Sequence, residues 1–318
     1  MGTMRGTVSL VILLLLLTGV AHAGGPQTDD TGPQAGAAKV IFDTDIGDDI
    51  DDAYALGFLL RSPEVQVLGV TTAFQDTHLR ARLVTRFLKA AGRSEVPVYE
   101  GPKTAGQSHF TQGKFAEGSP DRSYPDAIDF VLKTIRENPG QITLVAVAPL
   151  TNVGALIAKD PKTFGKLKRV VLMGGSVERG YGNKDGPEAE WNIVNDVAAA
   201  KALFTSGVPL FVMPLDSTQI PLDPARQAEL FGKKTEMARA LEELTAEWSA
   251  AVNRKSPLLF DVVAAAYAVK PEVCPTTAMR IEVDDKGFTR RVRGDANANV
   301  CLRSATGEFF DLFMSRVF

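Results

Sequence analysis

The residues best suited to chemistry in this 318-residue chain are six carboxylates within ten positions. They are Asp43, Asp45, Asp48, Asp49, Asp51 and Asp52. Carboxylates packed into one loop repel one another, and several would take up protons unless positive charge lies among them. A hard cation with oxygen ligands resolves that conflict, and calcium accepts many oxygens in irregular geometry. The run therefore predicts a cation site with Ca²⁺ as the expected ion.

Two other interpretations of the acidic run remain open at this stage. It could be a solvated turn at the start of a helix, where Asp51 and Asp52 would be favourable against the helix dipole. It could also carry aspartyl-phosphate chemistry of the haloacid-dehalogenase type, which places Asp-x-Asp after a first apolar strand. That pattern usually has Thr or Val where this chain has Gly47, and no convincing late pair of aspartates follows. An EF-hand loop is not expected, because Gly47 stands at the fifth position of the run instead of the sixth.

The elements that must position this loop alternate between short β-branched runs and longer segments with helical spacing. We expect strands over 39–43, 65–73, 142–148, 169–173 and 210–215. We expect helices over 51–60, 77–91, 126–137, 151–159, 196–206, 234–251 and 261–269. Short antiparallel strands are expected over 279–283, 289–292 and 299–302, at the sheet edge. Strands that are apolar on both faces and separated by helices predict an α/β fold with an open, mostly parallel central sheet and helices on both faces.

In an open parallel sheet the ligand site lies outside the carboxyl ends of the strands. The polar segments that directly follow the predicted strands should therefore converge. These segments are 43–52, 71–76, 149–152, 174–195 and Asp216.

Several separated motifs, in a fixed order from about Lys39 to the C-terminus, resemble the inosine–uridine-preferring nucleoside hydrolases. The motifs are Asp43-Thr44-Asp45-Ile46-Gly47 with Asp51-Asp52-Ala53, Gly69-Val70-Thr71-Thr72-Ala73, Pro149-Leu150-Thr151-Asn152, Met173-Gly174-Gly175-Ser176, Glu190-Trp191-Asn192, Leu215-Asp216-Ser217-Thr218 and Phe260-Asp261. Each motif is weak alone, and the ordered set carries the resemblance. It implies an open α/β fold and a calcium-dependent enzyme that hydrolyses ribonucleosides to ribose and free base.

The resemblance also implies roles for individual residues. Asp43, Asp52 and Asp261 resemble the calcium carboxylates, and the carbonyl of Thr151 resembles the main-chain ligand. Asp43 would also be the general base toward a calcium-bound water. The residues expected to contact the substrate are Asp51, Asp76, Met173, Asn183, Glu190, Trp191 and Asn192. Met173 could equally be core packing, and Trp191 could simply close the end of the sheet.

The chain departs from the family pattern at the residue before the late aspartate. Many members have a His there, proposed to protonate the departing base, and this chain has Phe260. His109 could be a substitute acid, or the base could leave by stacking on an aromatic side chain. Two extra residues before the Asp51-Asp52 pair also let Asp48 or Asp49 compete for metal roles. A non-catalytic ribose- or nucleoside-binding protein on the same scaffold is the alternative function.

The N-terminal residues resemble an export signal. A positive start, an apolar run over 8–17 and a small-x-small site before residue 24 predict a signal peptide over 1–23. The segment 24–38 has almost no apolar bulk and is expected to be a disordered spacer. A single catalytic domain would then span 39–318. We expect a secreted or periplasmic protein with no membrane association after cleavage, and an uncleaved anchor is the alternative.

Charge and cysteine content restrict the partners. The formal net charge is −3 and no Lys/Arg block is present, which argues against nucleic acid. The expected partner is a small ribonucleoside, and a homo-oligomer is possible. Cys274 and Cys301 are the only cysteines. They could pair in an oxidising compartment or remain as two thiols.

Overall fold

A nine-stranded sheet forms the centre of the computed structural model, which describes residues 1–3, 33–106 and 109–316. The strands are β1 (Ala38–Thr44), β2 (Val65–Thr72), β3 (Val98–Glu100), β4 (Ile142–Ala146), β5 (Arg169–Met173), β6 (Leu210–Met213), β7 (Thr277–Val283), β8 (Thr289–Val292) and β9 (Ala298–Val300). Their order is β3-β2-β1-β4-β5-β6-β9-β7-β8. Neighbours pair in parallel from β3 through β9. The predicted open, mostly parallel sheet is confirmed.

The last three strands differ in one respect from the expectation that all would be antiparallel. β7 pairs antiparallel with β8 and with β9, but β9 pairs in parallel with β6. The chain leaves the β7–β8 hairpin and returns between β6 and β7. Because β9 must run opposite to β7 there, it continues the parallel part of the sheet.

The sheet separates two hydrophobic cores, and successive strand residues alternate between them. In β1, Val40 and Phe42 belong to one core and Ile41 to the other. This alternation is the period-two geometry of a strand that is buried on both faces. It explains why the β1 sequence is apolar without a polar face.

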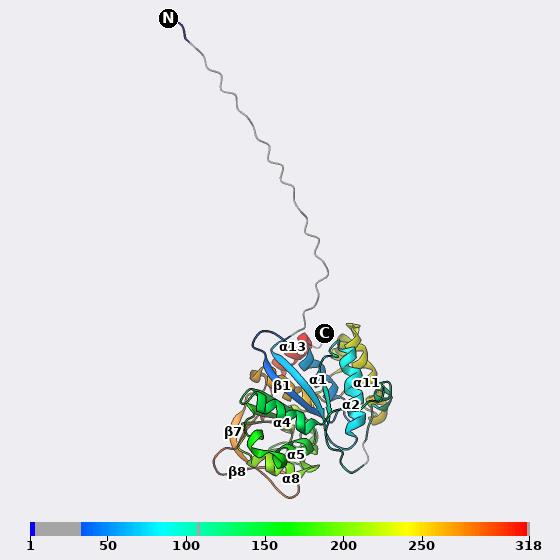
Figure 1. The fold of residues 1–318 in the computed structure, drawn as a ribbon, viewed down its shortest axis with the longest axis vertical. Coiled ribbons are helices and arrows are strands. Elements are labelled where there is room, and N and C mark those ends of the chain that lie inside the picture. The colour runs from blue at the N-terminus through cyan, green and yellow to red at the C-terminus, as the bar shows by residue number, and fades with distance from the viewer. Residues whose placement is uncertain (4–32, 107–108, 317–318) are drawn as a thin grey trace. The chain divides into compact units, whose positions relative to one another are not determined.

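Helices cover both faces, as predicted. The first core contains residues of α1 (Asp51–Leu60), α2 (Thr77–Ala90), α11 (Glu236–Val252), α12 (Phe260–Val269) and α13 (Thr306–Arg316). The second contains residues of α4 (Ala127–Glu137), α5 (Thr151–Lys159) and α8 (Val197–Thr205). In Figure 1, α4, α5 and α8 lie together, apart from α1, α2 and α11.

Several elements were not predicted, and most of them are short. They are β3, α3 (Gly113–Glu117), α6 (Pro161–Phe164), the 3₁₀ turn η1 (Tyr181–Asn183), α7 (Trp191–Val194), α9 (Leu215–Thr218), α10 (Pro224–Gly232), the 3₁₀ turn η2 (Pro271–Val273) and α13. Elements of three to five residues carry too few positions for a periodic pattern to show.

A long connection between β3 and α4 is tied to α2 by a histidine. His78 lies 2.9 Å from a carboxylate oxygen of Glu100 through Nδ1 and 2.6 Å from one of Asp121 through Nε2. Hydrogen bonds from the ring to the carboxylates of Asp121 and, to a smaller extent, Glu100 raise the pKa of His78. The protonated ring therefore connects the end of β3 with the far end of this connection.

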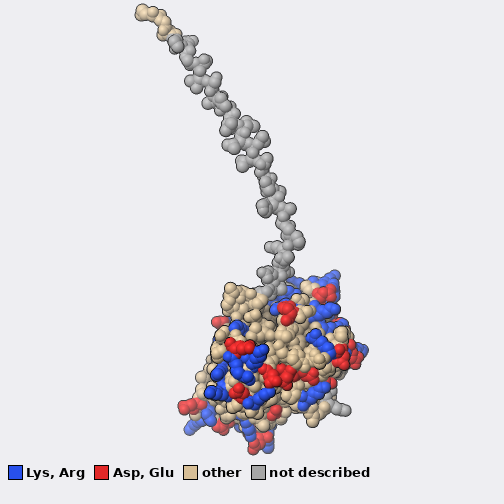
Figure 2. Space-filling view, in the orientation of Figure 1, with Lys and Arg blue, Asp and Glu red and all other residues tan. Residues whose placement is uncertain are grey.

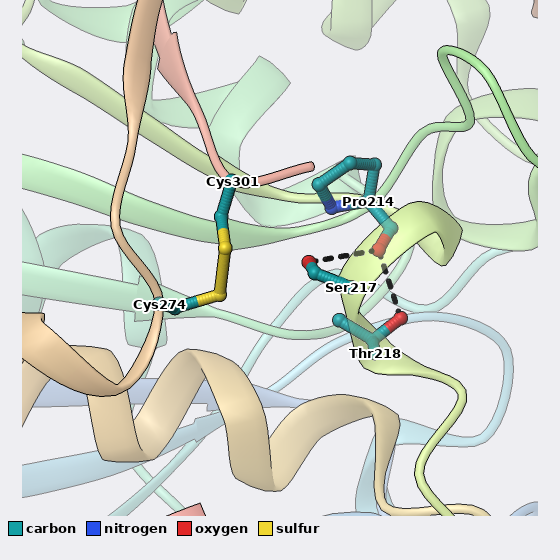
Figure 3. Close-up of a disulfide and its surroundings, with 5 residues drawn as sticks. All are labelled: Pro214, Ser217, Thr218, Cys274 and Cys301. Carbon is teal, nitrogen blue, oxygen red and sulfur yellow. Dashed lines mark hydrogen bonds between the residues drawn. A yellow bond between two sulfur atoms is a disulfide. The ribbon is translucent and has the colours of Figure 1, made fainter. Parts of the chain in front are cut away.

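A disulfide joins Cys274 and Cys301, so the open question of their pairing is answered (Figure 3). Their Cα atoms are 5.7 Å apart, and both residues are fully buried. The bond connects the segment after α12 to the end of β9, where the Cys301 amide donates to the Val212 carbonyl of β6. The same view shows α9, where two side-chain hydroxyls donate to the Pro214 carbonyl.

The N-terminal predictions lie mainly outside the described residues. Residues 4–32 contain nearly all of the expected signal peptide and most of the expected spacer. At the end of that spacer, the amide of Gln34 donates to the Pro63 carbonyl and that of Ala38 to the Glu64 carbonyl. Among the described residues, backbone hydrogen bonds to the rest of the domain are thus already present before position 39.

The part of the chain that the structure describes contains no helix long and apolar enough to span a membrane. Basic and acidic side chains are intermixed on the face seen in Figure 2.

Candidate active site

A cavity of about 640 Å³ opens at the carboxyl edge of the sheet. Its wall includes Val147 just after β4, Met173 at the end of β5, and Leu215 just after β6. The remaining lining comes from the acidic loop, from residues 109–111, from 181–192, and from α11 and α12. The site therefore forms where the ends of the parallel strands were expected to converge.

Three buried carboxylates form the floor of the cavity. Asp51 and Asp52 begin α1, and Asp261 lies in the first turn of α12. One oxygen from each lies within 4.8 Å of the others, and each residue is only 3–4% exposed. The amide of Asp261 donates to Asp51 Oδ2 at 3.0 Å, which fixes the two helices against each other.

The electrostatics of this floor favour a cation. Burial, and then repulsion from one another and from the neighbouring Asp45 and Asp49, raises the pKa of these three carboxylates well above the usual value for aspartate. All side-chain atoms of this floor that could ligate an ion are oxygens. The Thr44 hydroxyl donates a hydrogen bond to Asp52 but supplies no positive charge. A hard divalent ion fits such a donor set.

Asp45 lies in the cavity wall, whereas Asp43 does not. Asp45 is 6% exposed, and burial raises its pKa to about 7. Asp43 accepts hydrogen bonds from the Thr71 hydroxyl and the Asn152 amide, both at 2.6 Å, while its second oxygen is buried without a partner. Burial raises the pKa of Asp43 to about 6. The expected position of Asp43 at the substrate is therefore wrong, and Asp43 lies behind the wall.

A fully buried arginine holds the acidic loop from behind. Arg80 is 0% exposed, and its guanidinium donates to the carbonyls of Phe74, Asp45 and Ile46. It also pairs with Asp48 at 3.0 Å. Arg80 therefore neutralises one carboxylate of the run and directs several carbonyls of the loop away from the cavity.

The other carbonyls of the acidic loop are held by residues after position 110. The Thr111 amide donates to the Gly47 carbonyl at 2.8 Å, and its hydroxyl donates to the Asp48 carbonyl at 2.8 Å. The Gln112 side-chain amide donates to the Asp49 carbonyl at 2.7 Å. The acidic loop is consequently hydrogen-bonded along its whole outer side.

Gly47 is required for this packing. Its φ is +121°, and a Cβ there would lie 2.3 Å from the ring of Phe110. Phe110 can therefore pack directly on the loop backbone, next to His109 in the cavity wall.

Glu190, Asn192 and Met173 form a polar wall beside the floor. Glu190 caps α7, and its carboxylate accepts from the amides of Gly175 and Asn192, both at 2.9 Å. Asn192 donates to the carbonyls of Val147 and Met173 at 3.0 and 3.1 Å. Burial raises the pKa of Glu190 to about 7. These predicted residues are brought together as expected.

Aromatic side chains line the outer part of the cavity. Tyr181 and Trp191 are 37% and 45% exposed, and the Trp191 amide donates to the Tyr181 hydroxyl at 3.0 Å. Trp248 of α11 is buried, and its indole hydrogen-bonds to Asp49. Phe260 stands next to Asp261 in the same wall.

Comparison with known proteins agrees with this arrangement. A family model described as inosine-uridine preferring nucleoside hydrolase matches residues 40–311. The chain belongs to this family. Among its relatives, a probable uridine nucleosidase 2 of Arabidopsis thaliana is 31% identical over 273 residues, which cover 79% of this chain and 84% of that protein.

Two further members of the nucleoside hydrolase family show the range of similarity. A probable uridine nucleosidase 2 of Oryza sativa subsp. japonica is 36% identical over 222 residues, 64% of each chain. The chain spans 62–66% of the length of several curated relatives. The solved structure of a purine-preferring ribonucleoside hydrolase from Gardnerella vaginalis has a TM-score of 0.77 at 26% identity, covering 88% of this chain and 98% of that one.

Three other residues expected to act in this site do not line the cavity. Asp76 is exposed and caps α2, where its carboxylate accepts from the Leu79 amide at 3.1 Å. Asn183 is exposed in a left-handed conformation with φ +59° and is hydrogen-bonded to Gln219. Thr151 begins α5 and is absent from the wall. Asp76 is displaced because the helix starts directly at it, and Asn183 because its turn faces outward.

Sequence reasoning missed several residues that line this cavity. They are Val147, Tyr181, Leu215, Trp248, Ala251, Val252, Phe110 and Thr111, and Asp45 was given only a possible supporting role. One signal was available, since the chain has only two tryptophans and both line the cavity.

Proposed function

We propose that this chain hydrolyses the N-glycosidic bond of ribonucleosides to ribose and free base, with Ca²⁺ held by Asp52 and Asp261 of the floor and by Asp45, the carboxylate whose charge acts most strongly on Asp52. The observation that carries the proposal is the meeting of a three-carboxylate floor and a polar wall in one cavity. Such a site can hold a cation and grip a polyhydroxylated ring at the same time.

The residues of the cavity divide the chemistry between them. Breaking the bond develops positive charge on the ribosyl ring, and the surrounding carboxylates stabilise that charge. Asp51 and Asn192 are placed to bond the ring hydroxyls, and Glu190 to bond a hydroxyl farther along the wall. Fixing the ribose in this way makes the attack of water effectively intramolecular.

The proton of the attacking water goes to Asp45 in this proposal. Its carboxylate lies in the wall, whereas both the hydrogen bonds and the position of Asp43 point away from the cavity. Asp43 then acts by holding the ends of β2 and α5 beside Asp45. A bound Ca²⁺ would supply positive charge that favours loss of a proton from water.

The two aspartates give a matched test of these roles. Asp45→Asn should lower kcat for ribose release by about 10² or more, the usual contribution of a general base. Asp43→Asn keeps the shape of the side chain and should retain most of the activity. Release of reducing sugar from a panel of ribonucleosides, with and without a calcium chelator, measures both. If no ribonucleoside is turned over with Ca²⁺ present, the hydrolase proposal fails.

One observation favours a second candidate, a non-catalytic nucleoside-binding protein. Phe260 lies in the wall where many family members have a proton donor, and it cannot donate a proton. Calorimetry that detects binding of ribonucleosides, together with no product after long incubation, would select this candidate.

We also propose that the protein is exported. The N-terminal signal pattern motivates this, and the buried Cys274–Cys301 disulfide supports it because such bonds persist in oxidising compartments. Expression with the full N-terminus should give mature protein outside the cytoplasm that begins near residue 24. Intact protein retained in the cytoplasm would contradict the proposal.

A further inference from the structure

The charge of the cavity wall is entirely of one sign among the described residues. Seven carboxylates line it, and neither Lys nor Arg does. They are Asp45, Asp48, Asp49, Asp51, Asp52, Glu190 and Asp261. Arg80 pairs with Asp48 from behind, and a dication on the floor would offset two more. The cavity therefore contains more carboxylates than a metal ion needs as ligands.

Aromatic rings surround the part of the cavity that lies away from the floor. Five line it: Phe110, Tyr181, Trp191, Trp248 and Phe260. Tyr181 and Trp191 are exposed, so they lie at the mouth, whereas the floor carboxylates are buried. If the ribose is held at the floor, the base must occupy this aromatic region.

One carboxylate borders both the floor and the aromatic region. Asp49 lines the cavity, accepts the indole hydrogen bond of Trp248, and is close enough to Tyr181 to raise the pKa of that phenol. Its Oδ1 is also fixed by the Ile50 amide at 2.7 Å. Rings together with a fixed carboxylate form the kind of site that recognises an organic cation.

The same region has few side chains that could donate a proton to a departing base. Phe260 has no proton to give, and the Tyr181 phenol, although its side chain is partly exposed, is a weaker acid because desolvation and then the charge of Glu190 raise its pKa. The Glu190 carboxylate accepts backbone amides at both oxygens, which leaves lone pairs to accept from a substrate hydroxyl but favours the form without a proton to give. His109 is exposed, and no hydrogen bond to the described residues orients its ring. A neutral base needs a proton in order to leave well, and nothing fixed in this wall provides one.

We propose that the preferred substrates are ribosides whose base carries a fixed positive charge, such as N-ribosylpyridinium compounds. This inference rests on the proposed hydrolase function. The C1′–N bond breaks with its electron pair returning to the ring nitrogen, so the cationic base leaves as a neutral molecule without protonation. Water adds to C1′ and loses one proton, giving ribose, neutral base and H⁺. The missing donor at Phe260 and the negative aromatic region are then explained together.

The test compares matched charged and neutral compounds. Nicotinamide riboside is cationic, and its reduced dihydro form has nearly the same shape without the charge. The first should have kcat/KM at least about tenfold above the dihydro form, uridine and inosine, in excess Ca²⁺. Because a pyridinium is also an intrinsically better leaving group, binding is measured separately. The N-methylnicotinamide cation should inhibit at a concentration about tenfold lower than neutral nicotinamide does.

Two variants connect this preference to the residues. Asp49→Asn should lower the ratio of kcat/KM for nicotinamide riboside over uridine by about tenfold, while the exposed Asp311→Asn on α13 should leave that ratio as it is. Phe260→His should raise turnover of uridine and inosine more than turnover of nicotinamide riboside, because only the neutral bases need a proton.

The possible outcomes distinguish failure of the cationic-base inference from failure of the hydrolase proposal. Preference for uridine or inosine, equal inhibition by the charged and neutral amides, or loss of neutral-base activity in His109→Gln would overturn the cationic-base inference and leave the hydrolase proposal standing. If none of the four ribosides is hydrolysed, both are overturned. Cation preference that Asp49→Asn does not change would also overturn the assigned recognition.

Discussion

Replacing Arg80 with methionine should destabilise the fold through the back of the acidic loop. Methionine keeps much of the apolar stem but has no donors. The change removes the hydrogen-bond donor of three backbone carbonyls, those of Asp45, Ile46 and Phe74, which the fully buried Arg80 satisfies. It also removes the cation that pairs with Asp48 at 3.0 Å.

The magnitude follows from these contacts. Each stranded carbonyl costs about 1 kcal/mol or more, so three cost about 3 kcal/mol. The lost ion pair adds about 1 kcal/mol, because the Asp48 side chain is 16% exposed and can still reach water. The sum, about 4 kcal/mol, agrees with the cost of breaking a buried pair from one side. It is a large part of the usual total stability of a domain.

Urea unfolding followed by tryptophan fluorescence measures the loss. Arg82→Met is the matched control, since Arg82 lies on the same helix and also donates to carbonyls but is partly exposed. It should cost less than about 1 kcal/mol. Arg80→Lys should recover part of the loss, because it keeps the charge without the planar set of donors. A cost below about 1 kcal/mol for Arg80→Met would refute the reasoning.

Three further sets of substitutions should each lower the stability of the fold in a way that can be measured separately. Gly47→Ala should lower the urea midpoint more than Gly92→Ala does, because both glycines have positive φ but only the first would place a Cβ against a ring; equal losses would show that the contact relaxes at no cost. Cys274→Ser with Cys301→Ser opens a crosslink spanning 27 positions and should cost about 3–4 kcal/mol, whereas an unchanged Tm would contradict this. The folded pKa of His78 is raised, so the stability it contributes is complete below the unfolded pKa of about 6.5 and is lost as pH rises through the folded value. The Tm difference between wild type and His78→Gln should therefore be largest near pH 5–6 and shrink toward pH 9. A difference that does not change with pH would argue against ion pairs made by a protonated His78.

The parallel part of the fold was predictable because strands buried on both faces have nearly continuous apolar sequences. Runs such as 142–148 and 169–173 are apolar on both faces, and the helices between them have long apolar stripes. The direction of β9 was not predictable, since it depends on which gap in the sheet the strand enters. β3 and the short helices were missed because a few residues cannot display a period.

In the candidate site, positions fixed by local geometry were the predictable ones. Asp52 and Asp261 begin helices, and Glu190 caps one, so their placement follows from neighbours in sequence. The choice between Asp43 and Asp45 depends on where β1 ends. β1 continues through Thr44, so Asp43 still pairs as a strand residue and its side chain is taken up by neighbouring elements.

The remaining residues of the site come from distant segments. Tyr181 lies in a 3₁₀ turn several residues after β5, inside the long predicted segment 174–195, and Trp248 lies in the middle of a long helix. Only the tertiary packing of those segments brings them to the cavity. The rarity of tryptophan was the available hint, and of these two residues it applies to Trp248 alone.

The floor of the cavity also constrains the order in which the protein can acquire its ion. Asp51 and Asp261 are separated by 210 positions, yet their contact joins the first helix to α12. A nascent or truncated chain that ends before α12 has two of the three floor carboxylates and lacks the backbone amide that fixes Asp51. Tight cation binding should therefore report a completed fold. During refolding, the ion would act late, stabilising the finished protein instead of guiding its assembly.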